Sequence, residues 1–127
     1  MFSEAEVIYS YTRKQAIDDG VLIDLSALAP DVCRQHYKGS VACTTGVWEI
    51  VERAIANKHW RNDLNGVVHD ILWMSRHGKV ADLDASTILF RVIIKGAGRR
   101  SLYAFKVVCG PGDAGEPVIT VMLPDED

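Results

Sequence analysis

Apolar residues recur at helical spacing in two neighbouring segments in the middle of the chain. In the first, near residues 45–57, Thr44 or Thr45 stands where a helix N-cap is expected. In the second, near residues 63–77, Gly78 follows as a stop signal. The apolar positions are Val47, Ile50, Val51 and Ala54, then Leu64, Val67, Val68, Ile71 and Leu72. Two long amphipathic helices are therefore predicted, each with one face turned to a core.

The residue types change after Gly78. Three runs, residues 87–94, 102–108 and 118–122, are rich in the β-branched and aromatic side chains that favour strands. The connection between the first two runs is short and contains glycine, so it joins antiparallel neighbours. The pattern predicts a three-stranded antiparallel meander in the C-terminal part of the chain.

The N-terminal part shows shorter signals. Thr12 and Gln15 have the spacing of a capping box, which predicts a short helix over residues 13–19. Extended segments are predicted at residues 7–11 and 21–25, and a further helical segment at residues 30–37.

These elements predict one α+β domain spanning residues 1–127. Its N-terminal helices, with the two long ones near 45–57 and 63–77, are expected to pack on the C-terminal three-stranded antiparallel meander. The composition, 48% apolar and 24% charged, is typical of a globular protein with one core. The chain contains no repeat and no linker-like stretch that would divide it.

Charge and cysteine content narrow the function classes. A formal net charge of −3 has the wrong sign for a general phosphate binder, so a nucleic-acid partner is not favoured, although a local basic patch remains open. Cys33, Cys43 and Cys109 form no CxxC pair, and their odd number suits reduced thiols. The first residues are acidic, whereas a signal peptide begins with positively charged residues, and no apolar run is long enough to span a membrane. We expect a cytoplasmic protein without a membrane association.

Both ends of the chain carry distinctive sequence. Residues 7–13 read VIYSYTR and residues 109–124 read CGPGDAGEPVITVMLP, while TGVW and DILWM stand at residues 45–48 and 70–74. In these stretches the chain resembles an uncharacterised bacterial family whose members occur on plasmids, phages and other mobile elements. The resemblance implies no catalytic residues. It implies a protein that acts against, or regulates, a host system.

The glycine-rich loop from Gly110 to Pro117 is predicted to be a structural turn. A phosphate-binding loop leads into a helix N-terminus and usually includes a cation, whereas this loop leads into a strand and contains Asp113 and Glu116. Its carboxylates would repel phosphate, and they are too few for a calcium loop.

The polar side of the segment at residues 63–77 carries the main binding candidates. Trp73 lies opposite the apolar stripe at about 100° per residue, and His69, Arg76 and His77 flank it. Tryptophan and arginine dominate interaction hot spots, so this side is predicted to bind a protein partner. The alternative is that the helix is buried on two sides and Trp73 belongs to the core.

Arg99 and Arg100 form the main basic cluster, at the predicted turn between two strands, and they could contact RNA or an acidic protein surface. The simpler interpretation is that these charges keep a sheet edge soluble. The histidines and cysteines show no recognised zinc spacing, so neither a metal site nor a cofactor is predicted.

The leading hypothesis is a non-enzymatic binding or regulatory protein that inhibits a host defence or regulatory protein through a protein–protein interface. A first alternative is a small toxin-like ribonuclease that uses His69 or His77, Arg91 and Thr120 as base, cation and hydroxyl. A second alternative is a structural homo-oligomer, such as a homodimer, in which an exposed last strand pairs across a twofold axis.

Overall fold

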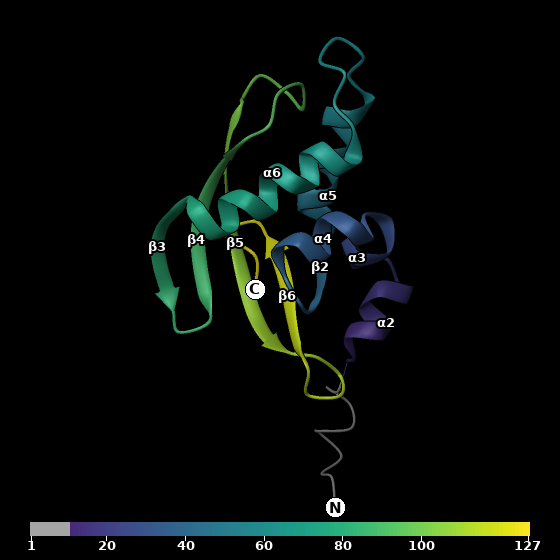
Figure 1. Cartoon of the computed structure of the whole chain (residues 1–127), viewed down its shortest axis with the longest axis vertical. Coiled ribbons are helices and arrows are strands. Elements are labelled where there is room, and N and C mark those ends of the chain that lie inside the picture. The colour runs from purple at the N-terminus through teal and green to yellow at the C-terminus, as the bar shows by residue number, and fades with distance from the viewer. Residues whose placement is uncertain (1–10) are drawn as a thin grey trace, which may run out of the picture.

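The computed structural model describes residues 11–127 and shows an α+β fold built on one six-stranded mixed sheet (Figure 1). Residues 7–10 of the predicted N-terminal extended segment lie outside the described residues. The helices are α2 (Arg13–Asp18), α3 (Leu25–Leu28), α4 (Pro30–His36), α5 (Thr45–Ala56) and α6 (Leu64–His77). The strands are β1 (Leu22–Asp24), β2 (Ser40–Thr44), β3 (Lys79–Asp84), β4 (Thr87–Ile93), β5 (Leu102–Pro111) and β6 (Pro117–Met122).

The predicted three-stranded antiparallel meander is wrong. The strands follow the order β1-β2-β6-β5-β4-β3, and β2 and β6 pair in parallel while the other neighbours are antiparallel. The three predicted strand runs correspond to β4, β5 and β6, but three further strands extend the sheet on both sides. The last strand, β6, therefore lies inside the sheet between β2 and β5. It offers no free edge, so the predicted pairing of an exposed last strand across a twofold axis is wrong.

Strand β1 lies within the extended segment predicted at residues 21–25, whereas β2 and β3 were missed for physical reasons. In β2 the side chains are small, and Val41, Ala42, Cys43 and Thr44 are all buried, so no alternation of polar and apolar residues marks it. In β3 the opposite holds, because its side chains are mostly exposed and it is an edge strand interrupted by two register shifts.

The helical layer also differs from the predicted pair of long N-terminal helices. Five helices are present in the described residues, and strands β1 and β2 are interleaved with them. The two longest, α5 and α6, begin after the N-caps Thr44 and Asp63, whose side chains accept from Val47 N and Gly66 N. Helix α6 crosses in front of β4 in Figure 1.

One hydrophobic core lies between the sheet and helices α3 to α6. Phe90 and Phe105, fully buried on neighbouring strands, pack edge to face with ring centroids 6.0 Å apart. The helices contribute mainly Leu25, Cys33, Val47, Val51, Val68, Ile71 and Leu72. Because side chains alternate along β6, Ile119 and Val121 face this core and Thr120 faces the other side of the sheet.

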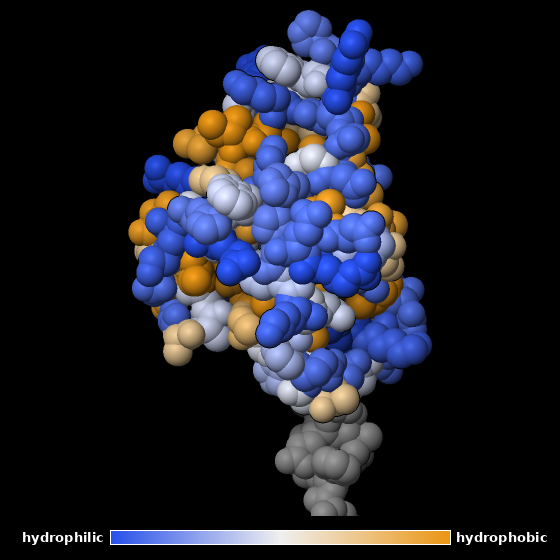
Figure 2. Space-filling view, viewed as in Figure 1, coloured by the Kyte–Doolittle hydropathy of each residue, from blue (hydrophilic) through white to orange (hydrophobic). Residues whose placement is uncertain are grey.

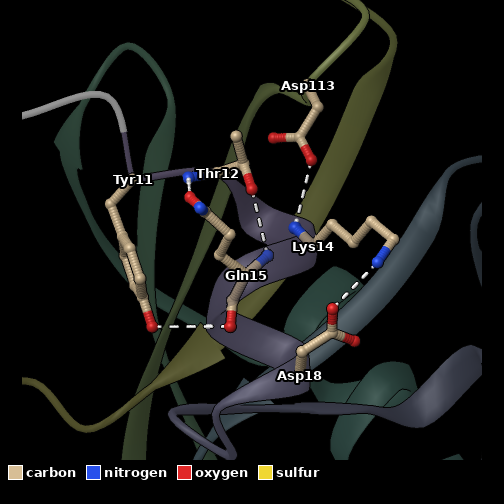
Figure 3. Close-up of polar contacts among 6 residues, drawn as sticks. All are labelled: Tyr11, Thr12, Lys14, Gln15, Asp18 and Asp113. Carbon is tan, nitrogen blue, oxygen red and sulfur yellow. Dashed lines mark hydrogen bonds and ion pairs between the residues drawn. The ribbon is translucent and has the colours of Figure 1, made fainter. Parts of the chain in front are cut away.

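Helix α2 lies on that other side and is tied to the loop before β6. Figure 3 shows its capping box, in which Thr12 accepts from Gln15 N at 3.0 Å and Thr12 N donates to Gln15 Oε1 at 2.9 Å. The carboxylate of Asp113 also accepts from the main-chain N–H groups of Arg13 and Lys14, at 2.8 and 3.0 Å. These two hydrogen bonds hold the pKa of Asp113 below its ordinary value.

The loop at residues 110–117 is therefore a structural turn, as predicted. Gly115 adopts a φ of 84°, and its N–H donates to Gly112 O at 3.0 Å. The Arg13 guanidinium adds a second tie, since it donates to Thr120 Oγ1 and Ile119 O at 2.7 and 2.8 Å. Arg13, the last residue of the first stretch that carries the family resemblance, thus contacts the C-terminal stretch. Within residues 11–127, no helix has the length and apolar content needed to cross a bilayer.

Candidate functional site

The outward side of α6 carries an exposed aromatic patch centred on Trp73. The indole is 48% exposed, and Arg76 and His77 are exposed beside it, with His69 half-buried one turn earlier. The opposite side of the helix, with Val68, Ile71, Leu72 and Ser75, is buried in the core. The alternative that α6 is buried on both sides is therefore wrong, and the four predicted binding residues share one surface.

Ring contacts hold this patch together. The rings of Trp73 and His77 have centroids 4.2 Å apart and an interplanar angle of 36°. The ring of His69 lies 6.1 Å from the same indole on its other side along the helix. Residues 69, 73 and 77 are four apart, so each ring lies one turn from the next. We call Trp73, His69, Arg76 and His77, with His36, the aromatic patch.

His36 completes the aromatic patch from α4, and sequence reasoning did not connect it with α6. Its Nε2 lies 3.0 Å from Nδ1 of His69, although the two residues are 33 positions apart in the chain. Arg76 Nη1 donates to the main-chain carbonyl of His36 at 2.9 Å, which satisfies an acceptor at the end of α4. No local spacing signals such a contact, because it depends on how α4 and α6 pack.

Tyr37 reinforces the same junction. Ser75 Oγ donates to Leu72 O at 2.6 Å, which leaves Ser75 to accept from the Tyr37 hydroxyl at 2.7 Å. The guanidinium of Arg76 lies 5.9 Å from the centre of the Tyr37 ring. The polar part of the aromatic patch is therefore pre-organised by α4, which reduces the ordering cost of binding.

Burial and neighbouring charge favour the neutral form of His36. Its side chain is almost fully buried, and desolvation is the main cause that lowers its pKa from the ordinary value. The nearby groups His69, Arg76 and His77 lower the pKa further. A neutral His36 can act as donor or acceptor toward His69 across their 3.0 Å contact, depending on its tautomer.

A hydrophobic hollow adjoins the aromatic patch. A space of about 220 Å³ is lined by Asp70, Trp73, Met74, Val92 and Ile93, between α6 and β4. A second space of about 260 Å³ continues along the same two elements to Lys95 and shares Asp70 and Ile93 with the first. We call these two spaces together the α6–β4 groove. Figure 2 shows hydrophobic surface gathered between the β4–β5 turn and α6.

Arg99 and Arg100 are exposed but lie outside the aromatic patch. They belong to the β4–β5 turn, whose main chain is held by the α5–α6 region: Arg53 Nε donates to Ala97 O, and Asn57 Nδ2 donates to Gly96 O. The nearby Tyr103 is buried in the core, so its ring is not exposed beside these arginines. The two arginines are charges at a hairpin tip, and the exposed ring of Trp60 lies against the same turn at Lys95 and Gly96.

The residues of the ribonuclease alternative are not brought together. His69 and His77 lie on α6, on the helical side of the sheet, whereas Thr120 faces the opposite side and is bonded to Arg13. Arg91 is exposed on β4, at a position that alternates with the core residues Phe90 and Val92. A base, a cation and a hydroxyl must converge on one phosphate for this chemistry, and these groups do not.

A further hollow, of about 330 Å³, lies between α2 and the β1–β2–β6 part of the sheet, and charged side chains line much of it. Its carboxylates have structural partners: Asp113 caps α2, Asp24 caps α3 and Asp18 pairs with Lys14. In residues 11–127 no three metal-ligating side chains gather around one point. The aromatic patch and its groove are therefore the best candidate for a functional surface.

The fold is α+β, and the aromatic patch on it is exposed and held in place by α4. The chain belongs to the family of unknown function DUF6573, whose family model matches residues 1–127. No curated protein and no solved structure matches the chain.

Proposed function

We propose that this protein is a non-enzymatic binding protein that acts on a protein partner through the aromatic patch on α6. The partner is a host defence or regulatory protein, and binding inhibits or regulates it in the bacterial cytoplasm. The mobile-element origin belongs to the same proposal, and it rests on the resemblance of the chain's two ends and middle to a family carried by plasmids and phages.

The exposure of Trp73 carries the proposal. An indole that is 48% exposed leaves a large apolar area in water, and burial of such area is the main driving force of protein association. Its histidine and arginine neighbours supply polar groups at the rim, as interfaces require. The hydrogen bonds from α4 fix these groups before any partner arrives.

The chemistry of the surface also favours protein over nucleic acid as the partner. The aromatic patch carries one arginine, and Asp70 lies next to it in the α6–β4 groove. Binding to a nucleic-acid backbone depends on several cations that contact phosphates. A carboxylate at the centre of the surface would oppose that binding.

Affinity capture with matched tryptophan variants tests the proposal. The tagged full chain is incubated with lysate of the native host, as wild type, as Trp73→Ala and as Trp60→Ala. Trp60 is the matched control because its side chain is also 48% exposed but lies in the α5–α6 connection. We expect a reproducible partner with the wild type and with Trp60→Ala, and its loss with Trp73→Ala.

Circular dichroism of the three proteins establishes that they are equally folded. Mass spectrometry identifies the captured protein and shows whether it belongs to a defence or regulatory system. The proposal fails if no protein is captured reproducibly, or if Trp73→Ala captures the partner as well as the wild type does.

A further inference from the structure

Two strands of the sheet run beyond a neighbour: β5 at Leu102–Phe105 extends past the end of β6, and the end of β4 extends past β3. Strand β3 pairs with β4 only as far as Lys79 opposite Phe90, and Gly78 lies beside Arg91 O, so β4 continues beyond them at Val92 and Ile93. Figure 1 shows β3 beside the lower part of β4 only. The two outer edges of the sheet are protected. Strand β3 carries two register shifts and the exposed Lys79–Asp82 ion pair, and β1 has three residues.

The hydrogen-bond pattern shows which main-chain groups face this open edge. Ile94 N donates to Ser101 O at 2.8 Å, so the even-numbered residues of β4 bond to β5. The odd-numbered residues then point their N–H and C=O groups to the opposite side. Lys95 obeys this rule, because its carbonyl accepts from Asn62 Nδ2 at 2.7 Å rather than from β5. Ile93 therefore presents both an N–H and a C=O to the open edge.

The α6–β4 groove runs along this edge. Its two spaces, of about 260 and 220 Å³, both include Ile93 and Asp70 in their lining. Trp73 and Met74 provide an apolar wall on the helix side, and the Ile93 side chain is 59% exposed. An added strand would find hydrogen-bonding groups along the sheet edge and apolar surface above it.

Charge identifies the occupant further. Asp70 is exposed in the middle of the groove and forms no ion pair with any residue of 11–127. Lys95, at the far end, lies 5.8 Å from the centre of the Trp60 ring, and its charge is directed toward that ring. A basic side chain of the occupant would therefore be favoured near Asp70, with an apolar side chain next to Trp73 and Met74.

We propose that the α6–β4 groove binds an extended segment of the partner protein as an added β-strand, with main-chain hydrogen bonds to Ile93 and a basic side chain facing Asp70. This inference rests on the proposed function, because it names how the partner is held at the Trp73 surface. It explains why the exposed indole lies next to the one stretch of β4 that no strand of residues 11–127 covers.

The test begins with a phage-displayed library of random 12-residue peptides selected on the full chain. We expect the selected peptides to combine a basic residue with apolar residues at alternate positions. In the complex, amide hydrogen exchange of Ile93 should slow at least tenfold. The amide of Ile94 is the internal control, because it is already bonded to Ser101 O in the free protein.

Three variants separate the parts of the inference. Ile93→Pro removes the edge N–H while leaving the hydrogen bonds between β4 and β5, and it should weaken binding of the selected peptide at least tenfold. Ile93→Val retains the N–H and should bind as the wild type does. The Asp70→Lys variant should no longer bind the selected peptide. It should bind a second version of the peptide in which glutamate replaces the basic residue. This last variant keeps the main chain intact, so it gives an answer even if Ile93→Pro does not fold.

The inference is overturned if the library yields no binder, if bound peptide leaves the Ile93 amide unprotected, or if the charge exchange at Asp70 restores nothing. A second copy of the chain could also occupy the groove, and measuring the mass of the protein in solution shows whether it forms a dimer. A dimer that Ile93→Pro dissociates would also overturn the inference. If the captured host protein is lost with Trp73→Ala but kept with Ile93→Pro and Asp70→Lys, the proposed function stands and strand addition is wrong.

Discussion

Replacing Gly39 by alanine should strongly destabilise the fold, because Gly39 lies where β2 begins to run beside β6. A Cβ atom at this position would lie 2.2 Å from Pro117 O and 3.1 Å from Pro117 C. Carbon–oxygen contacts of this kind need about 3.3 Å, so the two strands would have to separate by about 1 Å. The separation would fall next to Ser40 and Val118, the first pair of the parallel ladder.

The cost follows from the nature of the contact. Overpacking costs about 1–3 kcal/mol, and the upper value applies because main-chain atoms cannot rotate away as a side chain can. Alanine also reduces the entropy of the unfolded chain, which returns about 0.5–1 kcal/mol. A net loss of about 2 kcal/mol is expected. With a urea dependence of about 1.5 kcal/mol per molar, the unfolding midpoint should fall by about 1.3 M.

Gly110→Ala is the matched control. Gly110 lies in β5 opposite Val118, and a Cβ atom there would have no neighbour within 4 Å. The same substitution should therefore leave the urea midpoint unchanged or raise it slightly. Equal midpoints for the Gly39 and Gly110 variants, measured by circular dichroism, would show that β2 does not run beside β6 as described.

Three further results are expected. Leu72→Ala should lower the free energy of unfolding, measured in urea, by about 3 kcal/mol, because Leu72 is fully buried. Trp73→Ala should lower it clearly less, because Trp73 is exposed. Similar losses for the two variants would mean that Trp73 belongs to the core. Burial and nearby charge lower the pKa of His36, so the unfolded chain binds the extra proton first and stability should fall as pH decreases below about 6.5. His36→Gln should flatten that part of the melting-temperature profile, and an unchanged slope would contradict this assignment. A thiol reagent should modify exposed Cys109 rapidly and Cys43 only after unfolding, because burial raises the pKa of Cys43 to about 12; fast labelling of Cys43 would refute its burial.

Local sequence signals predicted the elements whose formation depends on nearby residues. The capping box of Thr12 and Gln15 and the amphipathic pattern around residues 45–57 and 63–77 correspond to α2, α5 and α6. Each of these signals is complete within one or two helical turns. The turn at residues 110–117 was likewise predictable, because glycine and proline determine its main-chain geometry.

The sheet could not be predicted in the same way. The pairing of β2 with β6 joins Val41 to Ile119, and no pattern within either strand reports the other. The buried run at residues 41–44 has no alternation, so periodicity does not distinguish it from part of a helix or a loop.

The candidate site was half predictable for the same reason. The positions of His69, Trp73, Arg76 and His77 on one side of α6 follow from helical spacing alone. The contribution of His36 and the open edge at Ile93 follow from packing and from the length of β3, and both needed the three-dimensional structure.

The interior position of β6 has a consequence for how the protein is made. During synthesis, β1 and β2 leave the ribosome long before residues 117–122, yet β2 has no other strand than β6 to join it to the rest of the sheet. The edge of β2 that pairs with β6 therefore has no partner until nearly the whole chain has emerged. Pairing between strands so far apart in the chain slows folding, and apolar side chains of β2 stay exposed until β6 pairs with it.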